Sequence, residues 1–131
     1  MERRAVSSVN PMEQTVGYSR AVRAGDRVCV SGTCAVWPDG SVDPDPGVQA
    51  RRCFEIIGAA LDDAGFTFDD VVRTRLFVVH AADFPALGAV HGEVLGHVRP
   101  ATTGLVVAAL LDPRWKVEVE VEAVRVGESA G

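Results

Sequence analysis

The sequence predicts an α+β fold in which two helices cover one face of a single mixed β-sheet. Three observations support this prediction: a strand–turn–strand pattern, two segments whose apolar residues repeat at helical spacing, and further segments whose apolar residues alternate. Two helices are too few to cover both faces of a sheet. The second face carries charged and apolar residues together, so we expect it to meet other subunits.

The first element is a β-hairpin over residues 18–33. Residues 18–24 and 27–33 are apolar or alternate, and Gly25-Asp26 between them suits a tight turn. The segment 37–47 that follows is rich in Pro, Gly and Asp, which predicts a loop.

Residues 48–64 change to a helical period and end before Gly65, a typical residue after a helix. The apolar stripe of this helix consists of Cys53 or Phe54, Ile57, Leu61 and Ala64. Residues 71–79 then predict a strand. One of its faces carries Val72, Leu76 and Val78, and the other carries Arg73, Arg75 and Phe77.

A second helix is expected to begin near Asp83, because Asp favours the N-cap and Pro85 is tolerated in the first turn. Its stripe consists of Phe84, Leu87, Val90 or His91, and Val94. Residues 103–109 and 117–126 predict two more strands. In the last strand, valines and Ala123 alternate with Glu118, Glu120 and Glu122.

Composition limits the functional classes. The length suits one domain over residues 1–131, with a core at about 15–126 and short flexible termini. No apolar run or leader-like segment predicts membrane insertion or export, so we expect a cytoplasmic protein. The net charge of −5 argues against a nucleic-acid partner.

The three cysteines are predicted to be buried, reduced and unreactive. Cys29 lies in an apolar run, Cys53 lies on the helix stripe, and Cys34 has no CxxC partner. The three histidines form no ligand set with them, and His91 is expected to pack against the core. The sequence therefore predicts no metal site.

Four short segments resemble the RidA (YjgF) family of enamine and imine deaminases. They are Gly17-Tyr18-Ser19, Val30-Ser31-Gly32, Arg99-Pro100-Ala101-Thr102-Thr103 and Val119-Glu120-Val121-Glu122-Ala123. The resemblance covers about residues 15–126. It implies the RidA fold, which is chorismate-mutase-like, and a homotrimer with a central β-barrel. It also implies small-molecule clefts between subunits, and no cofactor.

The resemblance also implies roles for individual residues. Glu120 matches the glutamate that holds the attacking water, and Tyr18 matches a cleft residue. Thr102 stands where the deaminases carry the arginine that binds the substrate carboxylate, and Gly88 stands where they commonly carry asparagine. Ser31, Gly32, Thr103 and Gly104 complete the expected substrate-binding set.

Several alternatives remain open at this point. Arg75 either replaces the missing arginine or forms a cross-strand ion pair with the glutamates. Glu120 either orients water or is one more member of a solvated ladder, and Tyr18 either touches ligand or packs between subunits. The chain is then an imine hydrolase for a substrate other than 2-aminoacrylate, or a trimer that only binds a metabolite. An endoribonuclease or translation inhibitor is the least favoured reading.

Overall fold

The computed structural model describes residues 2–8 and 10–126. Six strands form one sheet in the order β1-β2-β3-β6-β4-β5, in which β4 and β5 are parallel and all other neighbours are antiparallel. The strands are β1 (Arg3–Val6), β2 (Ala21–Ala24), β3 (Arg27–Thr33), β4 (Val71–Val78), β5 (Ala101–Val106) and β6 (Val117–Val124). The helices are α1 (Pro46–Asp63) and α2 (Phe84–Leu95), with short turns η1 (Glu13–Gly17), η2 (Phe68–Asp70) and η3 (Ala81–Asp83).

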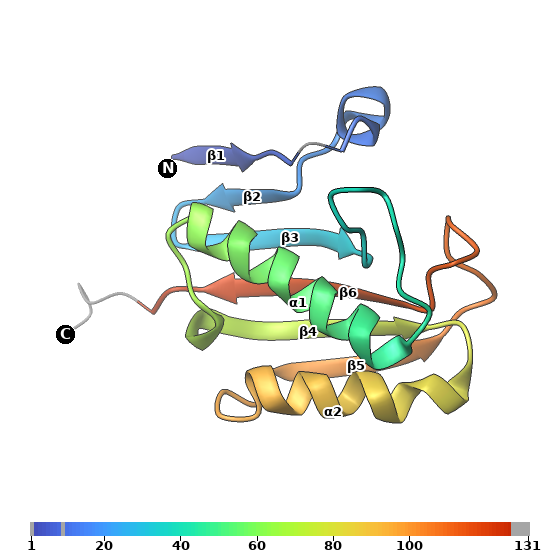
Figure 1. Ribbon diagram of the computed structural model, residues 1–131. Coiled ribbons are helices and arrows are strands. Elements are labelled where there is room, and N and C mark those ends of the chain that lie inside the picture. Colours follow the sequence, from blue (N-terminus) through green and yellow to red (C-terminus); the bar gives the residue numbers. More distant parts are fainter. Residues whose placement is uncertain (1, 9, 127–131) are drawn as a thin grey trace.

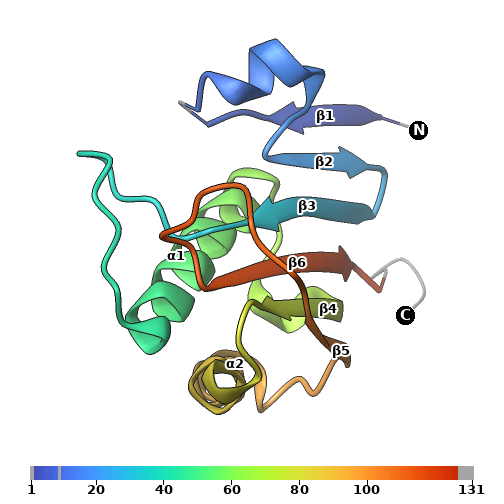
Figure 2. The same cartoon turned by 90° about the vertical axis from the view of Figure 1, so that its right-hand side faces the viewer.

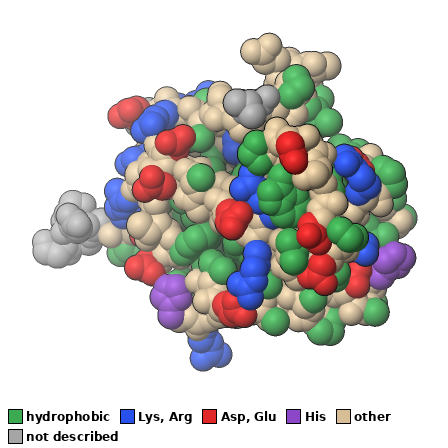
Figure 3. Space-filling view, in the orientation of Figure 1, with side chains coloured by type: hydrophobic (Ala, Val, Ile, Leu, Met, Phe, Trp, Pro, Cys, Tyr) green, Lys and Arg blue, Asp and Glu red, His purple; other side chains and the backbone are tan. Residues whose placement is uncertain are grey.

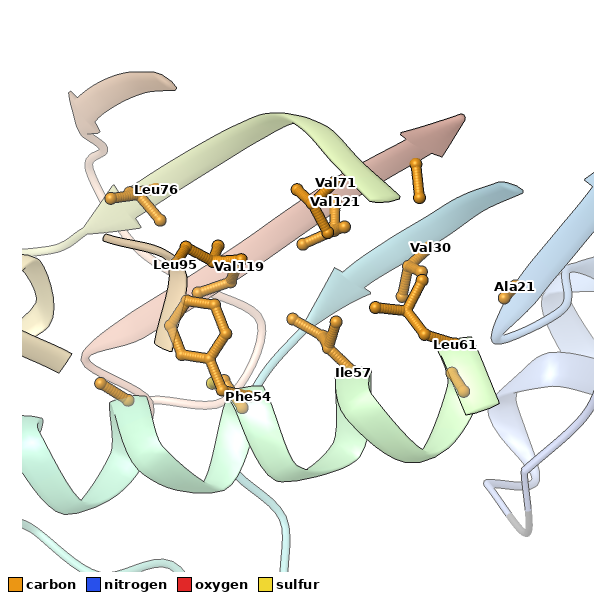
Figure 4. Close-up of a cluster of buried hydrophobic side chains, with 14 of the residues drawn as sticks. Ala21, Val30, Phe54, Ile57, Leu61, Val71, Leu76, Leu95, Val119 and Val121 are labelled. Carbon is orange, nitrogen blue, oxygen red and sulfur yellow. The ribbon is translucent and has the colours of Figure 1, made fainter. Parts of the chain in front are cut away.

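Both helices lie on the same side of the sheet (Figures 1 and 2). This confirms the predicted plan of one mixed sheet with two helices on one face. We call this side the helix-covered face and the other side the open face. Between sheet and helices, the apolar side chains of Ile57, Leu61, Leu76, Val119 and Val121 are at most 1% exposed (Figure 4). Among the described residues, no helix is long and apolar enough to cross a membrane.

Helix α1 begins two residues earlier than its apolar stripe predicts. Asp45 caps it, because its carboxylate accepts a hydrogen bond from the Val48 N–H at 2.9 Å, and Pro46 occupies the first turn. The helix ends before Gly65, whose φ of +82° is a conformation that glycine adopts without strain.

A register shift in β4 makes one face assignment wrong. The pairing with β6 is irregular between Val71 and Arg73, so Val71 is buried and Val72 is 44% exposed. The bulge changes which residue points to the core, and simple alternation cannot reveal it. The rest of the strand follows the prediction, with Leu76 and Val78 buried and Arg75 half-buried.

Other boundaries differ as well. The first hairpin strand begins at Ala21, the fifth strand spans Ala101–Val106 instead of 103–109, and the last ends at Val124. The prediction that Cys29 is buried is wrong: Cys29 is exposed, because Val28 and Val30 on either side of it face the core. The sequence did not predict β1, which pairs with β2. The expected flexible termini include residues 1 and 127–131, which lie outside the described residues.

Candidate functional site

The predicted site residues fall into two groups on the sheet. Tyr18, Ser31, Gly32 and Glu120 lie where β2, β3 and β6 adjoin, and Arg75 lies opposite Glu120 on β4. Gly88, Thr102 and Gly104 lie on α2 and β5, at the far edge. Thr103 is also on β5 and stands opposite Arg75 in the parallel register.

Tyr18 and Ser31 lie at one open hollow. The Tyr18 N–H donates to the Glu13 carbonyl at 3.0 Å, and the Ser31 hydroxyl donates to the Ser19 carbonyl at 2.7 Å. The hollow has a volume of about 530 Å³ and is lined by Arg3, Glu13, Gln14, Gly17, Tyr18, Ser19, Val22 and Ser31. The sequence analysis did not identify Arg3 and Glu13, because both lie before every motif. They come to line the same hollow as Tyr18 only when β1 and η1 are in place.

A bulge in β3 positions Ser31 and Gly32. Val30 pairs with Val121 and Thr33 pairs with Val119, so two residues of β3 stand against Glu120 alone. A Cβ atom on Gly32 would lie 2.8 Å from Oε2 of Glu118, which is closer than such contacts occur. Glycine at this position therefore leaves room for the Glu118 carboxylate.

Arg75 forms a cross-strand ion pair with two glutamates. Its Nη1 lies 3.1 Å from Oε1 of Glu120 and 3.6 Å from Oε1 of Glu122. The three side chains are 30 to 39% exposed, so solvent screens this interaction in the single chain. The geometry matches the ion-pair alternative, and the Glu120 carboxylate is held by Arg75.

Glu118 has a different partner. Its Oε1 accepts a hydrogen bond from Sγ of Cys34 at 2.9 Å. Burial, followed by the neighbouring Glu118, raises the pKa of the Cys34 thiol far above its ordinary value, and burial raises the pKa of Cys53 to about 12. Both thiols are buried and stay protonated, as predicted for unreactive cysteines. In the described part of the chain, no group of three or more His, Cys, Asp or Glu residues is arranged to hold a metal ion.

At the other edge of the sheet, Thr102 belongs to an uncharged hydrogen-bonded cluster. Its hydroxyl lies 2.8 Å from the hydroxyl of Thr74 and donates to the Pro100 carbonyl at 3.1 Å. The Thr74 hydroxyl also lies 2.9 Å from Nε2 of His91, and Thr74 is fully buried. Burial lowers the pKa of His91, which favours the neutral ring. The Thr102 hydroxyl is thus engaged within the chain and brings no charge.

Gly88 and Gly104 both lie against the ring of Phe84. A Cβ atom on Gly104 would lie 2.6 Å from Cε1 of Phe84, whereas one on Gly88 would make an ordinary contact at 3.7 Å with Cε2. The absence of a side chain at Gly104 lets the ring pack between α2 and β5. In the isolated chain, this is a packing role.

Tyr18 and Thr102, one from each group, are too far apart to contact the same small ligand within one chain. Tyr18 precedes β2 and Thr102 lies on β5, and these strands are four positions apart in the sheet order. At a strand spacing of roughly 4.8 Å, the separation is about 19 Å. A small ligand that contacts both Tyr18 and Thr102 therefore needs two copies of the chain, whereas Arg75 and Thr103 are neighbours within one chain.

Comparison with known proteins decides the family. The family model described as endoribonuclease L-PSP matches residues 9–125, nearly the whole chain. The chain belongs to this family. A crystal structure of a Mycobacterium tuberculosis member of the YjgF/YER057c/UK114 family superposes with a TM-score of 0.87, at 40% identity, over 95% of this chain and all of the other. RidA from Psychrobacter superposes with a TM-score of 0.79, at 30% identity, over 92% of this chain and 94% of the other.

Sequence relatives agree with the L-PSP (RidA/YjgF) assignment. An uncharacterized Streptomyces coelicolor protein is 42% identical, over 93% of this chain and 92% of its own length. The 2-iminobutanoate/2-iminopropanoate deaminase of Salmonella typhimurium is 34% identical, over 82% of this chain and 87% of its own length. The resemblance found in the sequence is confirmed, and with it the RidA-like fold. Assignment to a subgroup without the arginine stays a prediction.

Proposed function

We propose that this L-PSP family protein hydrolyses an imine or enamine other than 2-aminoacrylate, in a cleft between subunits of a homotrimer. The observation that carries the proposal is a retained carboxylate, Glu120, combined with an uncharged, internally bonded hydroxyl at Thr102. The similarity to a protein named 2-iminobutanoate/2-iminopropanoate deaminase supports the reaction class.

In this reaction a water oxygen bonds to the imine carbon and a carboxylate takes up the water proton. The nitrogen is protonated and leaves as ammonia when the C–N bond breaks, and a carbonyl compound remains. Glu120 is the proposed proton acceptor. Tyr18, Ser31 and Gly32 would border the substrate from the β2–β3 side, and Gly88, Thr102, Thr103 and Gly104 from the β5 side of a neighbouring copy.

The uncharged cluster around Thr102 argues against a substrate that the protein binds through the substrate's own carboxylate group. An arginine binds a carboxylate through two charge-assisted hydrogen bonds, and hydrogen bonds to charged groups contribute roughly 1.5–3 kcal/mol. Without that arginine, binding of an amino-acid-derived enamine should weaken roughly ten- to a hundredfold. Arg75 offers weak compensation, since Glu120 and Glu122 already hold its guanidinium.

Exposure of strand β5 supports assembly. All six of its residues are exposed in the single chain, including Leu105 at 44% and Val106 at 60%. An apolar edge strand of this kind is usually covered in a native protein. The separation of about 19 Å between β2, which follows Tyr18, and β5, which carries Thr102, is consistent with a site shared by neighbouring copies.

One observation favours the alternative of a trimer that only binds a metabolite. Arg75 engages the Glu120 carboxylate at 3.1 Å, and a carboxylate oxygen held by a guanidinium is less available to accept a proton-bearing water. An endoribonuclease is less well supported, despite the family's description. The net charge is −5, and basic and acidic side chains are interspersed over the helix-covered side (Figure 3).

The test compares ammonia and keto-acid release from freshly generated 2-aminoacrylate by the native protein and by Thr102→Arg. We expect little activity from the native protein and a gain from Thr102→Arg, with Thr102→Met as the uncharged control of similar length. Activity of the native protein would contradict the proposed substrate preference, and Arg75→Ala would then test whether Arg75 supplies the charge. Inactivity of both proteins on this and other imines would favour the binding alternative.

A further inference from the structure

The three glutamates on the open face of β6 differ in their electrostatic partners. Glu120 and Glu122 share Arg75. In the described residues, no ion pair involves Glu118, whose one side-chain partner is the neutral thiol of Cys34. Among these three glutamates, Glu118 is therefore the one that contacts no basic side chain in the described residues.

Arg20 is a basic residue close to the Glu118–Cys34 pair, but its guanidinium has a different hydrogen-bond partner. Its Nη2 donates to the Gly32 carbonyl at 2.7 Å, and its buried Nε has no acceptor within the described part of the chain. The guanidinium supports the backbone of the β3 bulge and does not pair with Glu118. It lowers the pKa of Cys34 slightly against the larger opposing effects of burial and of Glu118.

The surroundings of Glu118 suit a small organic cation. Phe77 stands directly opposite on β4, where side chains of paired residues lie roughly 5 Å apart, and it is half-buried. Gly32 on the other side contributes no side chain, and a Cβ atom there would lie 2.8 Å from Oε2 of Glu118. A carboxylate beside an aromatic ring is an arrangement that binds ammonium-like groups, through ionic and cation–π attraction.

We propose that Glu118 binds the protonated nitrogen of the substrate, and that the substrate class is an iminium ion derived from a primary amine without a carboxylate. This inference rests on the proposed function and deepens it. Glu118 attracts a cation at the β3–β6 side, while the uncharged Thr102 cluster leaves a substrate carboxylate without a counter-ion. Glu118 acts here as a binding residue, and Glu120 remains the proposed proton acceptor.

The test uses two imines that differ only in the carboxylate. A flavin amine oxidase makes one from 3-methylbutylamine, and an amino-acid oxidase makes the other from leucine, with catalase present. Hydrolysis is followed as the loss of semicarbazide-trapped imine. We expect the native protein to prefer the amine-derived imine. Glu118→Gln should lower kcat/KM for it about tenfold, mainly through KM.

Glu122→Gln is the matched control, since it removes a carboxylate from the same face of the same strand and should stay within about twofold of native. Gly32→Ala should act like Glu118→Gln, because the new Cβ atom displaces the carboxylate. Circular dichroism and thermal midpoints identify any variant that fails to fold. Equal losses for Glu118→Gln and Glu122→Gln, or equal rates on both imines, would overturn this inference and leave the proposed function standing.

Inactivity of the native protein on both imines would instead contradict the proposed function. Glu118 is then tested by calorimetric titration with 3-methylbutylammonium chloride. Binding to the native protein and to Glu122→Gln, with at least tenfold weaker binding to Glu118→Gln, would support the cation site. Absence of binding, or equal binding by all three proteins, would overturn it.

Discussion

The helix-covered face and the open face of the sheet are built from the same strands, but different forces act on them. On β6, Val117, Val119, Val121 and Ala123 are at most 1% exposed, and the three glutamates between them are half-buried. On the helix-covered face, removal of apolar area from water stabilises the fold. The open face holds charges that pair across strands without leaving water.

Polar groups show the same contrast. Gln49 is fully buried at the start of α1, and its amide donates to the carbonyls of Asp43 and Arg114 while its oxygen accepts from the Lys116 N–H. Each polar group of this side chain is satisfied within the chain. Glu118 and the exposed strand β5 keep capacity for further partners. The helix-covered face is complete in one chain, whereas the open face carries the groups on which the proposed assembly and ligand binding depend.

The largest expected effect tests this contrast directly. Leu61→Ala, in the core, should lower the free energy of unfolding by about 2–5 kcal/mol, because a buried side chain is replaced by a cavity. Leu105→Ala on the open face should cost less than about 1 kcal/mol in the isolated chain, since Leu105 is 44% exposed. Urea denaturation at a series of protein concentrations measures both.

A different result for Leu105→Ala would sharpen the comparison. If its cost approaches that of Leu61→Ala and grows with protein concentration, another subunit covers the open face in solution. If Leu61→Ala costs no more than Leu105→Ala at every concentration, the distinction between the two faces is wrong.

Alternation along the strands predicted most of this division. The repeat of Val117 to Ala123 against three glutamates correctly separated the two faces of β6, and Gly65 correctly marked the end of α1. Prediction failed where pairing partners decide the outcome. Val72 is exposed because β4 bulges, and β1 is too short and too rich in arginine to be recognised without β2 beside it.

The candidate site was predictable in residue identity but not in its contacts. The motifs identified Tyr18, Glu120 and Thr102, and the structure places them in two separate groups. The Cys34–Glu118 hydrogen bond depends on the β3 bulge, which leaves no mark in the hydrophobic pattern. The cluster of Thr102, Thr74 and His91 joins three elements that only the tertiary fold brings together.

Two glycines offer a test of intermediate size at the edge of the helix-covered face. Gly104→Ala should lower the free energy of unfolding by about 1–3 kcal/mol, because the new Cβ atom would lie 2.6 Å from the ring of Phe84. Gly92→Ala is the control: its Cβ atom meets nothing within 4 Å, and Ala is favoured over Gly in a helix by up to about 1 kcal/mol. Thermal denaturation of both variants gives the comparison. A Gly104→Ala protein as stable as native would mean that Phe84 moves freely and does not join α2 to β5.

The smallest expected effect concerns acid sensitivity of the helix-covered face. Burial holds the pKa of His91 below its ordinary value, so on acidification the unfolded chain takes up the proton first. The contribution of His91 is therefore complete above about pH 6.5 and is lost as the pH falls through the folded-state pKa. The ring contacts Phe54, Thr74 and Thr102, none of which is charged.

Between pH 7.5 and 5.5, the free energy of unfolding should fall more for the native protein than for His91→Gln, as measured by urea denaturation. If the free energy of unfolding falls equally with pH for the two proteins, His91 is protonated as easily in the folded chain as in the unfolded one. The cluster around Thr102 would then be open to solvent, like the charges of the opposite face.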